Sequence, residues 1–436
     1  MADQVLLIRG GTVVDETGER PGDVLVTGGR ITAVGAGLEV PAGATVLDAS
    51  DCLVAPGLVD LHTHLRQPGQ EEAETVETGA RAAALGGYTA VVAMPNTDPP
   101  IDSAAVASQV LELGRGAVCQ VAVAGAITVG RAGARLAPLG ELAALGVRLF
   151  TDDGAGVQDS GLMRRAFEYA GGLGVTLAQH CEDNSLACGG HMHEGEWSSR
   201  LGVPGIPAAA EEVMVARDIA LVRLTGAPVH FLHLSTSGSV ALVAAARAEG
   251  LPVTAEVAPH HLSLTHAELA GYDPLFKVNP PLRTAGDVEA LRQGCRAGVV
   301  DAVATDHAPH PQEAKDAPLD QAPPGLLGLQ TAWPVTLAAL TDVGMTPAGV
   351  LALLSWQPAR IAGLHPDQGG EQGGPVVAGA AANLCVLDPG ATWTVEPDRL
   401  ASLSRNTPWA GRTLTGAVRH TVYRGEPVVT DGEARR

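Results

Sequence analysis

The chain has almost no lysine and few aromatic residues. Of its 436 residues only Lys277 and Lys315 are lysines, so arginine supplies nearly all the positive charge, and Phe, Trp and Tyr together make up 3%. Its 48 acidic residues outnumber the 28 basic ones and give a formal net charge of −20. Nucleic acids and anionic membrane surfaces are bound by basic surfaces, so this balance argues against both as partners.

The sequence also lacks paired cysteines and long apolar runs. Its six cysteines include no Cys-x-x-Cys pair, and the first residues, Met-Ala-Asp-Gln, have neither the basic nor the apolar part of a secretory signal. No window has the uninterrupted apolar length that a membrane helix requires. We therefore expect a soluble protein in the cytoplasm with reduced cysteines.

Both ends of the chain have the pattern of short β-strands separated by glycine turns. The predicted strands are residues 4–8, 12–15, 23–27, 30–34, 383–387, 392–395, 417–423 and 426–429. A glycine-rich linker at 369–374 precedes the second group. This pattern predicts a small β-sandwich domain formed from both chain termini, residues 1–54 and 369–436.

The middle of the chain alternates apolar runs with segments of helical length, which is typical of βα units around a parallel sheet. The runs are residues 56–62, 88–95, 120–127, 147–152, 175–180, 228–234, 252–258 and 300–305. Eight such units close a (β/α)8 TIM barrel, in which catalytic residues lie at the C-terminal ends of the strands. We therefore predict an α/β fold with a catalytic barrel over residues 55–368.

Histidines and aspartates follow the ends of five of these runs. His62 and His64 are two residues apart on a predicted strand, so both imidazoles leave the same face and can bind one cation. Singly, such residues are ordinary buried histidines, helix caps or turns. Their convergence on one rim predicts a metal site formed by His62, His64, Asp153, His180, His233 and Asp306.

Six ligands exceed the needs of one tetrahedral zinc, so we expect two divalent ions ~3.5 to 4 Å apart, bridged by a carboxylate and a water-derived hydroxide. Some binuclear hydrolases use a carbamylated lysine as the bridge, but this chain has no lysine before Lys277. An aspartate must take that place. We favour Asp153 over its neighbour Asp152, which then supports the site or forms a turn.

These residues stand in motifs that resemble the amidohydrolase superfamily and, within it, the bacterial dihydroorotases that carry a bridging aspartate. The resemblance covers essentially the whole chain, and Gln67 is a departure where the family commonly has Glu. Its strings are Asp-Leu-His62-Thr-His64-Leu-Arg66-Gln-Pro-Gly, Met-Pro-Asn96-Thr, Phe-Thr-Asp-Asp153-Gly, Lys277-Val-Asn279-Pro-Pro-Leu-Arg283 and Ala-Thr-Asp306-His-Ala-Pro-His310. The fourth string is the narrowest signature.

The resemblance implies a role for each residue. His62 and His64 would hold one ion with Asp306, His180 and His233 would hold the other, and Asp153 would bridge them, with zinc as the expected metal. The implied substrate-binding residues are Arg66, Asn96, Asn279, His310 and the backbone around Pro324 and Gly325. Independently of the resemblance, His260 and His261 are adjacent and face opposite sides, so we expect at most one of them to face the site and to support it from outside the ligand set.

The implied activity is that of a dihydroorotase, the reversible cyclisation of N-carbamoyl-L-aspartate to L-dihydroorotate and water in de novo pyrimidine biosynthesis. The ring carries an exocyclic carboxylate, and Arg66 offers the planar pair of donors that suits it. In ring opening the bridging hydroxide would attack the amide carbonyl. Asp306 would act as general acid and base, moving the proton to the leaving nitrogen.

Other functions remain open at this stage. A hydantoinase, dihydropyrimidinase or allantoinase typically relies on the carbamylated lysine, and a mononuclear deaminase would leave Asp153 and one histidine unused. A non-catalytic scaffold for an aspartate transcarbamoylase is a further alternative, although such chains have lost ligands that are all present here. Assembly as a homodimer or with an aspartate transcarbamoylase is a separate hypothesis.

Overall fold

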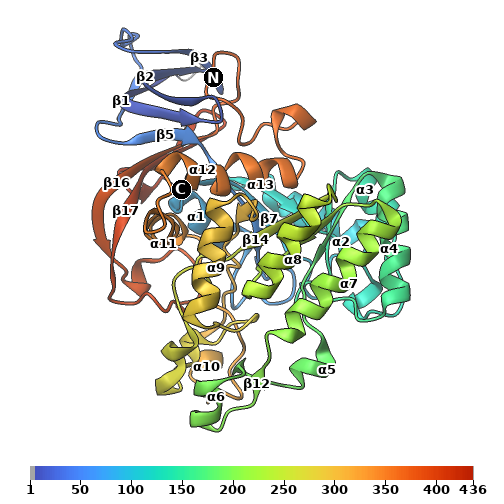
Figure 1. Cartoon of the computed structure of the whole chain (residues 1–436). Helices are drawn as coiled ribbons and strands as arrows, with labels where there is room; N and C mark the ends of the chain where they lie inside the picture. The colour runs from blue at the N-terminus through green and yellow to red at the C-terminus, as the bar shows by residue number, and fades with distance from the viewer. Residues whose placement is uncertain (1–4, 436) are drawn as a thin grey trace.

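Strands from both ends of the chain lie in one sheet in the computed structural model, which describes residues 5–435 (Figure 1). Its strand order is β19-β18-β17-β16-β5-β1-β2-β3, with β4 paired to β1 off this path. The strands are β1 (Val5–Asp15), β2 (Gly18–Thr27), β3 (Arg30–Gly35), β4 (Thr45–Asp48), β5 (Leu53–Pro56), β16 (Leu384–Thr394), β17 (Thr413–Tyr423), β18 (Glu426–Thr430) and β19 (Glu433–Ala434).

Two of these strands are continuous in the structure, although each was predicted from the sequence as two separate strands. The predicted strands 4–8 and 12–15 form the single strand β1, whose pairing with β2 shifts register between Ile8 and Gly11. Residue Gln4 lies outside the described residues. The predicted strands 383–387 and 392–395 likewise belong to β16. Irregular pairing at both places explains the interrupted alternation of apolar residues in the sequence.

Strand β5 connects the sheet to the rest of the molecule. It pairs parallel with β1 and antiparallel with β16, so one short strand joins segments from the two chain ends. The expected boundary between residues 54 and 55 falls inside this strand. Apolar side chains from both ends, including Leu6, Val24 and Leu384, are buried together on this sheet.

The middle of the chain contains a parallel strand in each of the eight predicted runs. They pair as two groups, β6-β7-β8 and β9-β10-β13-β14-β15. Isolated parallel bridges connect the groups at Gly125 with Phe150 and at Thr63 with His307. The strands are β6 (Leu58–Thr63), β7 (Tyr88–Ala93), β8 (Gln120–Val123), β9 (Leu149–Phe150), β10 (Thr176–Gln179), β13 (Val229–Phe231), β14 (Val253–Val257) and β15 (Ala302–Val303).

Helices alternate with these strands and cover them (Figure 1). Several begin at a side-chain cap, such as Asp159 before α4 and Thr284 before α9. The helices are α1 (Val76–Leu85), α2 (Ala104–Gly114), α3 (Leu139–Ala144), α4 (Ser160–Leu173), α7 (Ala209–Thr225), α8 (Ser237–Ala248), α9 (Ala285–Arg296), α11 (Ala332–Thr341), α12 (Pro347–Leu354) and α13 (Trp356–Ile361). None of the helices among residues 5–435 combines the length and apolarity needed to cross a membrane.

Short elements interrupt the loops that follow some strands. They are α5 (Asn184–Ala187), α6 (Glu196–Leu201), α10 (Gln312–Lys315), β11 (Met192–His193) and β12 (Gly205–Ile206). In Figure 1 α5, α6, α10 and β12 gather at the lower end of the view, opposite the N-terminal strands. The long βα loops therefore build one end of the molecule.

Asp60 on β6 joins the first and the last of the eight parallel strands. Its fully buried carboxylate accepts hydrogen bonds from the Thr305 amide at 2.8 Å and the Thr305 hydroxyl at 2.6 Å. The Thr63 hydroxyl donates to it as well, at 2.5 Å. One side chain therefore satisfies three donors where residues 60 and 305, far apart in the sequence, meet.

We expect Asp60→Ala to lower the free energy of unfolding by about 3 kcal/mol, because three buried donors lose their acceptor. Urea unfolding followed by circular dichroism measures the change. Asp398→Ala is the control, since the Asp398 side chain is exposed. A stability equal to that of the control would show that the Asp60 network does not hold the two strands together.

Candidate active site

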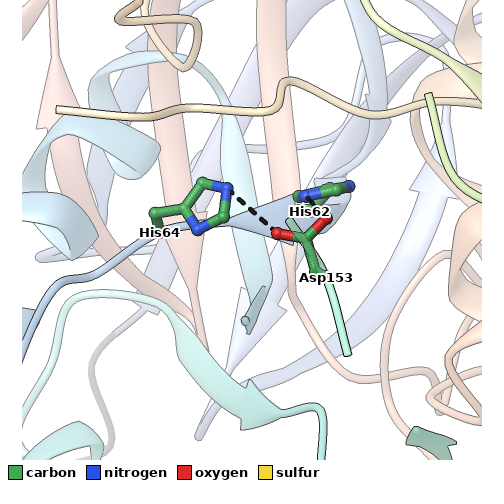
Figure 2. A group of neighbouring side chains, drawn as sticks. All are labelled: His62, His64 and Asp153. Atoms are coloured by element: carbon green, nitrogen blue, oxygen red, sulfur yellow. Dashed lines mark ion pairs between the residues drawn. The ribbon is translucent and has the colours of Figure 1, made fainter. Parts of the chain in front are cut away.

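Asp153 faces four buried imidazoles at the end of β9. Its Oδ1 lies 3.4 Å from His62 Nε2, 3.6 Å from His180 Nδ1 and 3.5 Å from His233 Nε2. Its Oδ2 lies 3.6 Å from His64 Nε2. Figure 2 shows the two carboxylate oxygens directed toward His62 and His64. The structure thus brings side chains from the ends of β6, β10 and β13 around one carboxylate at the end of β9.

The arrangement contains two groups that could each hold a metal ion. One is His62, His64 and Asp153, and the other is Asp153, His180 and His233, with the possible ligand atoms of each group within 4.8 Å of one another. His62 Nε2 is buried and has no hydrogen-bond partner among the described residues. Imidazole nitrogens turned toward a shared carboxylate, at separations longer than hydrogen bonds, suit cations between them.

Asp306 lies beside the first group. Its Oδ1 is 3.2 Å from His64 Nε2 and 3.6 Å from His62 Nε2. Asp306, His233 and Arg66 have positive φ angles of 47°, 29° and 61°, in a region that residues other than glycine rarely adopt. Such conformations persist where the surrounding structure fixes them, and they gather at functional sites.

The two aspartates stay ionised despite their burial. Burial alone would raise the pKa of Asp153, but the charge of His62 and the close imidazoles of His180 and His233 hold that pKa well below its usual range. Burial would also raise the pKa of Asp306, and a hydrogen bond from His64 together with the charge of His62 lowers it instead. The site therefore offers two carboxylates in their ligand form.

Glu256 on β14 orients His62, a role that the sequence analysis did not assign. Its buried carboxylate lies 2.9 Å from His62 Nδ1 and 3.0 Å from His230 Nε2. Burial would raise the pKa of Glu256, but the hydrogen bonds from His230 and His62 lower it to about 2. Because Nδ1 of His62 is engaged with Glu256, Nε2 is the ring nitrogen that faces Asp153. The sequence does contain a signal for this role, because Glu256 is a charged residue inside the apolar run 252–258.

Asp152 points away from this cluster and anchors the strand end. Its Oδ1 accepts from the amides of Ile127 and Thr128 at 2.9 and 3.0 Å, and its Oδ2 accepts from the Thr128 hydroxyl. Adjacent residues on an extended segment face opposite sides, so fixing Asp152 aims Asp153 at the imidazoles.

A cavity of about 170 Å³ opens above the imidazole cluster. Every predicted site residue except the fully buried His62 lines it, together with Gly154 and Ala308. Asn96 Oδ1 lies 2.8 Å from His64 Nδ1, so its amide nitrogen is left for a ligand. Asn279 Nδ2 lies 3.5 Å from His180 Nε2.

Arg66 lines the cavity and forms no ion pair with a carboxylate of the described part of the chain. Its Nε donates to the Pro309 carbonyl at 3.1 Å, and its Nη2 lies 3.4 Å from His310 Nε2. Burial lowers the pKa of Arg66 to about 10, which leaves the guanidinium charged at neutral pH. The cavity thus holds a cation that can meet an anionic ligand.

The Pro324 and Gly325 backbone is already engaged within the protein. The Pro324 carbonyl lies 2.9 Å from His310 Nε2, and the Gly325 amide donates to the Lys277 carbonyl at 2.8 Å. This segment therefore offers the cavity the surface of Pro324 and Gly325, while its polar groups hold the wall in place.

His260 and His261 are both buried behind the cluster. His261 Nε2 lies 2.9 Å from the Pro280 carbonyl, next to Asn279. Neither ring nitrogen of His260 has a hydrogen-bond partner among residues 5–435. Burial lowers the pKa of His261 to about 4, so this ring is neutral and donates to Pro280 as a fixed tautomer.

Comparison with known proteins gives matches over nearly the whole chain. Residues 51–239 match the family model described as Dihydro-orotase-like. The dihydroorotase of Pelotomaculum thermopropionicum is 48% identical over 98% of this chain and 99% of its own length. The dihydroorotase of Mycobacterium leprae is 49% identical over 97% of both chains.

Solved structures share the architecture at lower identity. The L-hydantoinase (dihydropyrimidinase) from Arthrobacter aurescens matches with a TM-score of 0.88 and 25% identity over 100% of this chain and 98% of that chain. The dihydropyrimidinase from Brevibacillus agri has a TM-score of 0.86 at 23% identity, covering 99% of this chain and 96% of that one. These matches confirm the expected α/β fold.

We expect Glu256→Gln to weaken zinc binding about 10-fold to 100-fold, because His62 loses the carboxylate that orients it. Competition with a chelator of known affinity measures the change. Glu141→Gln on α3 is the control, since that side chain is exposed. Equal zinc affinity of the two variants would mean that Glu256 does not act through a metal at His62.

Proposed function

The chain belongs to the dihydroorotase family, and from that premise we propose how its residues carry out the reaction. Dihydroorotases cyclise N-carbamoyl-L-aspartate to L-dihydroorotate with loss of water, and they open the ring in reverse. The carrying observation is 48% identity to a dihydroorotase over 98% of this chain, joined with a buried carboxylate that two histidine pairs share beneath a cavity. The chain is a metal-dependent cyclic amide hydrolase with a small-molecule substrate.

The scaffold for this reaction is a closed (β/α)8 barrel over residues 55–368, with a β-sandwich domain from residues 1–54 and 369–436. Eight parallel strands in the predicted order support this, as do the two isolated bridges that connect their groups. In such a barrel the C-terminal strand ends form one rim. The imidazoles and carboxylates all follow strand ends, in agreement with that geometry.

The metal centre would hold two divalent ions, with zinc as the expected metal. His62, His64 and Asp306 would hold one, His180 and His233 the other, and Asp153 both. The donor set fits this assignment, because it is buried, rich in imidazole and centred on a shared carboxylate. When bound, the two ions supply Lewis-acid activation of water and of the amide carbonyl.

The cavity residues would select the carboxylated ring. Arg66 can meet the exocyclic carboxylate with two parallel N–H groups, which suit a planar anion. The free amide nitrogen of Asn96 can donate a further hydrogen bond, and Asn279 lies across the cavity near His180. His310 and the Pro324–Gly325 wall would orient the ring so that its amide faces the imidazole cluster.

Asp306 would move the proton. It lies at the border between the imidazole cluster and the cavity, and it is ionised before substrate binds. In ring opening it accepts the proton of the attacking water and delivers it to the leaving ring nitrogen. In ring closure it takes the proton from the carbamoyl nitrogen and returns it to the departing oxygen.

The purified, metal-loaded protein should open L-dihydroorotate far faster than dihydrouracil, hydantoin or allantoin. Arg66→Met should lower kcat/KM for dihydroorotate by about 100-fold or more and affect an uncharged ring much less, because only dihydroorotate loses a charge-assisted pair. A spectrophotometric ring-opening assay measures all four substrates. Preference for an uncharged ring would assign the chain to another cyclic amidase function, and no turnover of any would favour a scaffold.

Asp306→Asn should lower kcat by about 100-fold to 10,000-fold, the range for losing a general acid and base. The amide of the asparagine still offers an oxygen ligand. Metal analysis should therefore find about two ions per chain in the variant and in the unaltered protein. The reaction rate and the metal content are measured on the same preparation. A variant that keeps its metal and a near-normal rate would remove Asp306 from the proton path.

A further inference from the structure

Both lysines of this chain hold the same loop. Lys277 Nζ donates to the Leu319 carbonyl at 2.7 Å, and Lys315 Nζ donates to the carbonyls of Pro323 and Gly325 at 2.9 and 3.1 Å. All other basic residues of the chain are arginines or histidines. A compact ammonium with three donors fits between carbonyls that flank one residue, whereas a guanidinium is larger and planar.

Lys315 is buried, and no carboxylate among residues 5–435 forms an ion pair with it. Its residue is 3% exposed, and both of its hydrogen-bond acceptors are backbone carbonyls. Burial lowers the pKa of Lys315 to about 7, with the charge of Lys277 adding to the effect. A buried ammonium costs free energy, so its retention requires a compensating role.

The clamped carbonyls stand on either side of Pro324, which lines the cavity. The Pro324 carbonyl lies 2.9 Å from His310 Nε2 and thereby fixes the ring nitrogen that carries the proton. A second donor, Asn406 Nδ2, reaches the Gly325 carbonyl at 3.1 Å and the Ala308 carbonyl at 3.0 Å. Two separate chain segments therefore converge on one wall of the cavity.

Gly325 leaves no room for this wall to shift toward residue 308. Its φ is 133°, and a Cβ at this position would stand 2.7 Å from Ala308 Cβ and 3.0 Å from His310 Nε2. The segments pair through the Ala308 amide, which donates to the Leu326 carbonyl at 2.8 Å. Any loosening of the clamp would open the cavity at His310.

We propose that Lys315 is a positioning residue, whose ammonium group holds Pro324 and Gly325 against residues 308–310 so that His310 and Arg66 are set for the substrate. This inference rests on the proposed function. A preformed wall spares the free energy of ordering the loop when substrate binds. Lys315 therefore acts on substrate affinity through backbone carbonyls and does not touch the reacting atoms.

The test compares Lys315→Met with Lys277→Met, the matched loss of the other buried lysine, whose acceptor Leu319 does not line the cavity. We expect Lys315→Met to raise KM for dihydroorotate about 10-fold with kcat within about 3-fold, the pattern of lost uniform binding. Lys277→Met should change KM much less. Hydrogen exchange should show the Gly325 amide opening faster in Lys315→Met.

The assay of the unaltered protein separates this inference from the proposed function. If that protein does not turn over dihydroorotate, the function fails, and the exchange rate at Gly325 alone tests the clamp. If it does, an unchanged KM in Lys315→Met, or an equal rise in Lys277→Met, overturns the role of Lys315. Should Lys315→Met not fold, Lys315→Gln replaces it with the same expected direction, because the shorter neutral amide cannot hold both carbonyls.

Discussion

The strand ends of this molecule are arranged around one buried carboxylate. Asp153 lies between four imidazoles that come from strands β6, β10 and β13, and each imidazole nitrogen stands 3.4 to 3.6 Å from its oxygens. A charge so deeply buried is tolerated only when opposite charge surrounds it. The ends of β6, β9, β10 and β13 must therefore lie close together. Parallel strands allow this, because their C-terminal ends lie on the same side.

A layer of buried hydrogen bonds holds these strand ends in place. Asp60 fixes the junction near residue 305, Asp152 turns Asp153 inward, and Glu256 sets the ring of His62. Each of these carboxylates binds groups from a strand other than its own. The site therefore has two layers of residues. One layer faces the cavity, and the other consists of the buried acids that orient the first.

The repeating strands and the polar residues at their ends could be predicted from the sequence. Both follow from local patterns, namely apolar runs and the residues that end them. The sequence could not assign a role to Glu256, since its partner His62 lies far away along the chain. It also could not assign one to Lys315, because the partners of Lys315 are nearby backbone carbonyls that no pattern of side chains marks. It also divided β1 and β16, where irregular pairing breaks the alternation. What the sequence missed is the support that depends on how the backbone folds.

Arg66 gives this acidic protein a buried cation at the cavity. Surface arginines such as Arg223 are neutralised by carboxylates, here Glu249 at 2.8 Å. The arginine at the cavity has a carbonyl partner instead, because Arg66 Nε donates to the Pro309 carbonyl. A carbonyl orients a cation without neutralising it, so the Arg66 guanidinium is available to an anionic ligand in the cavity.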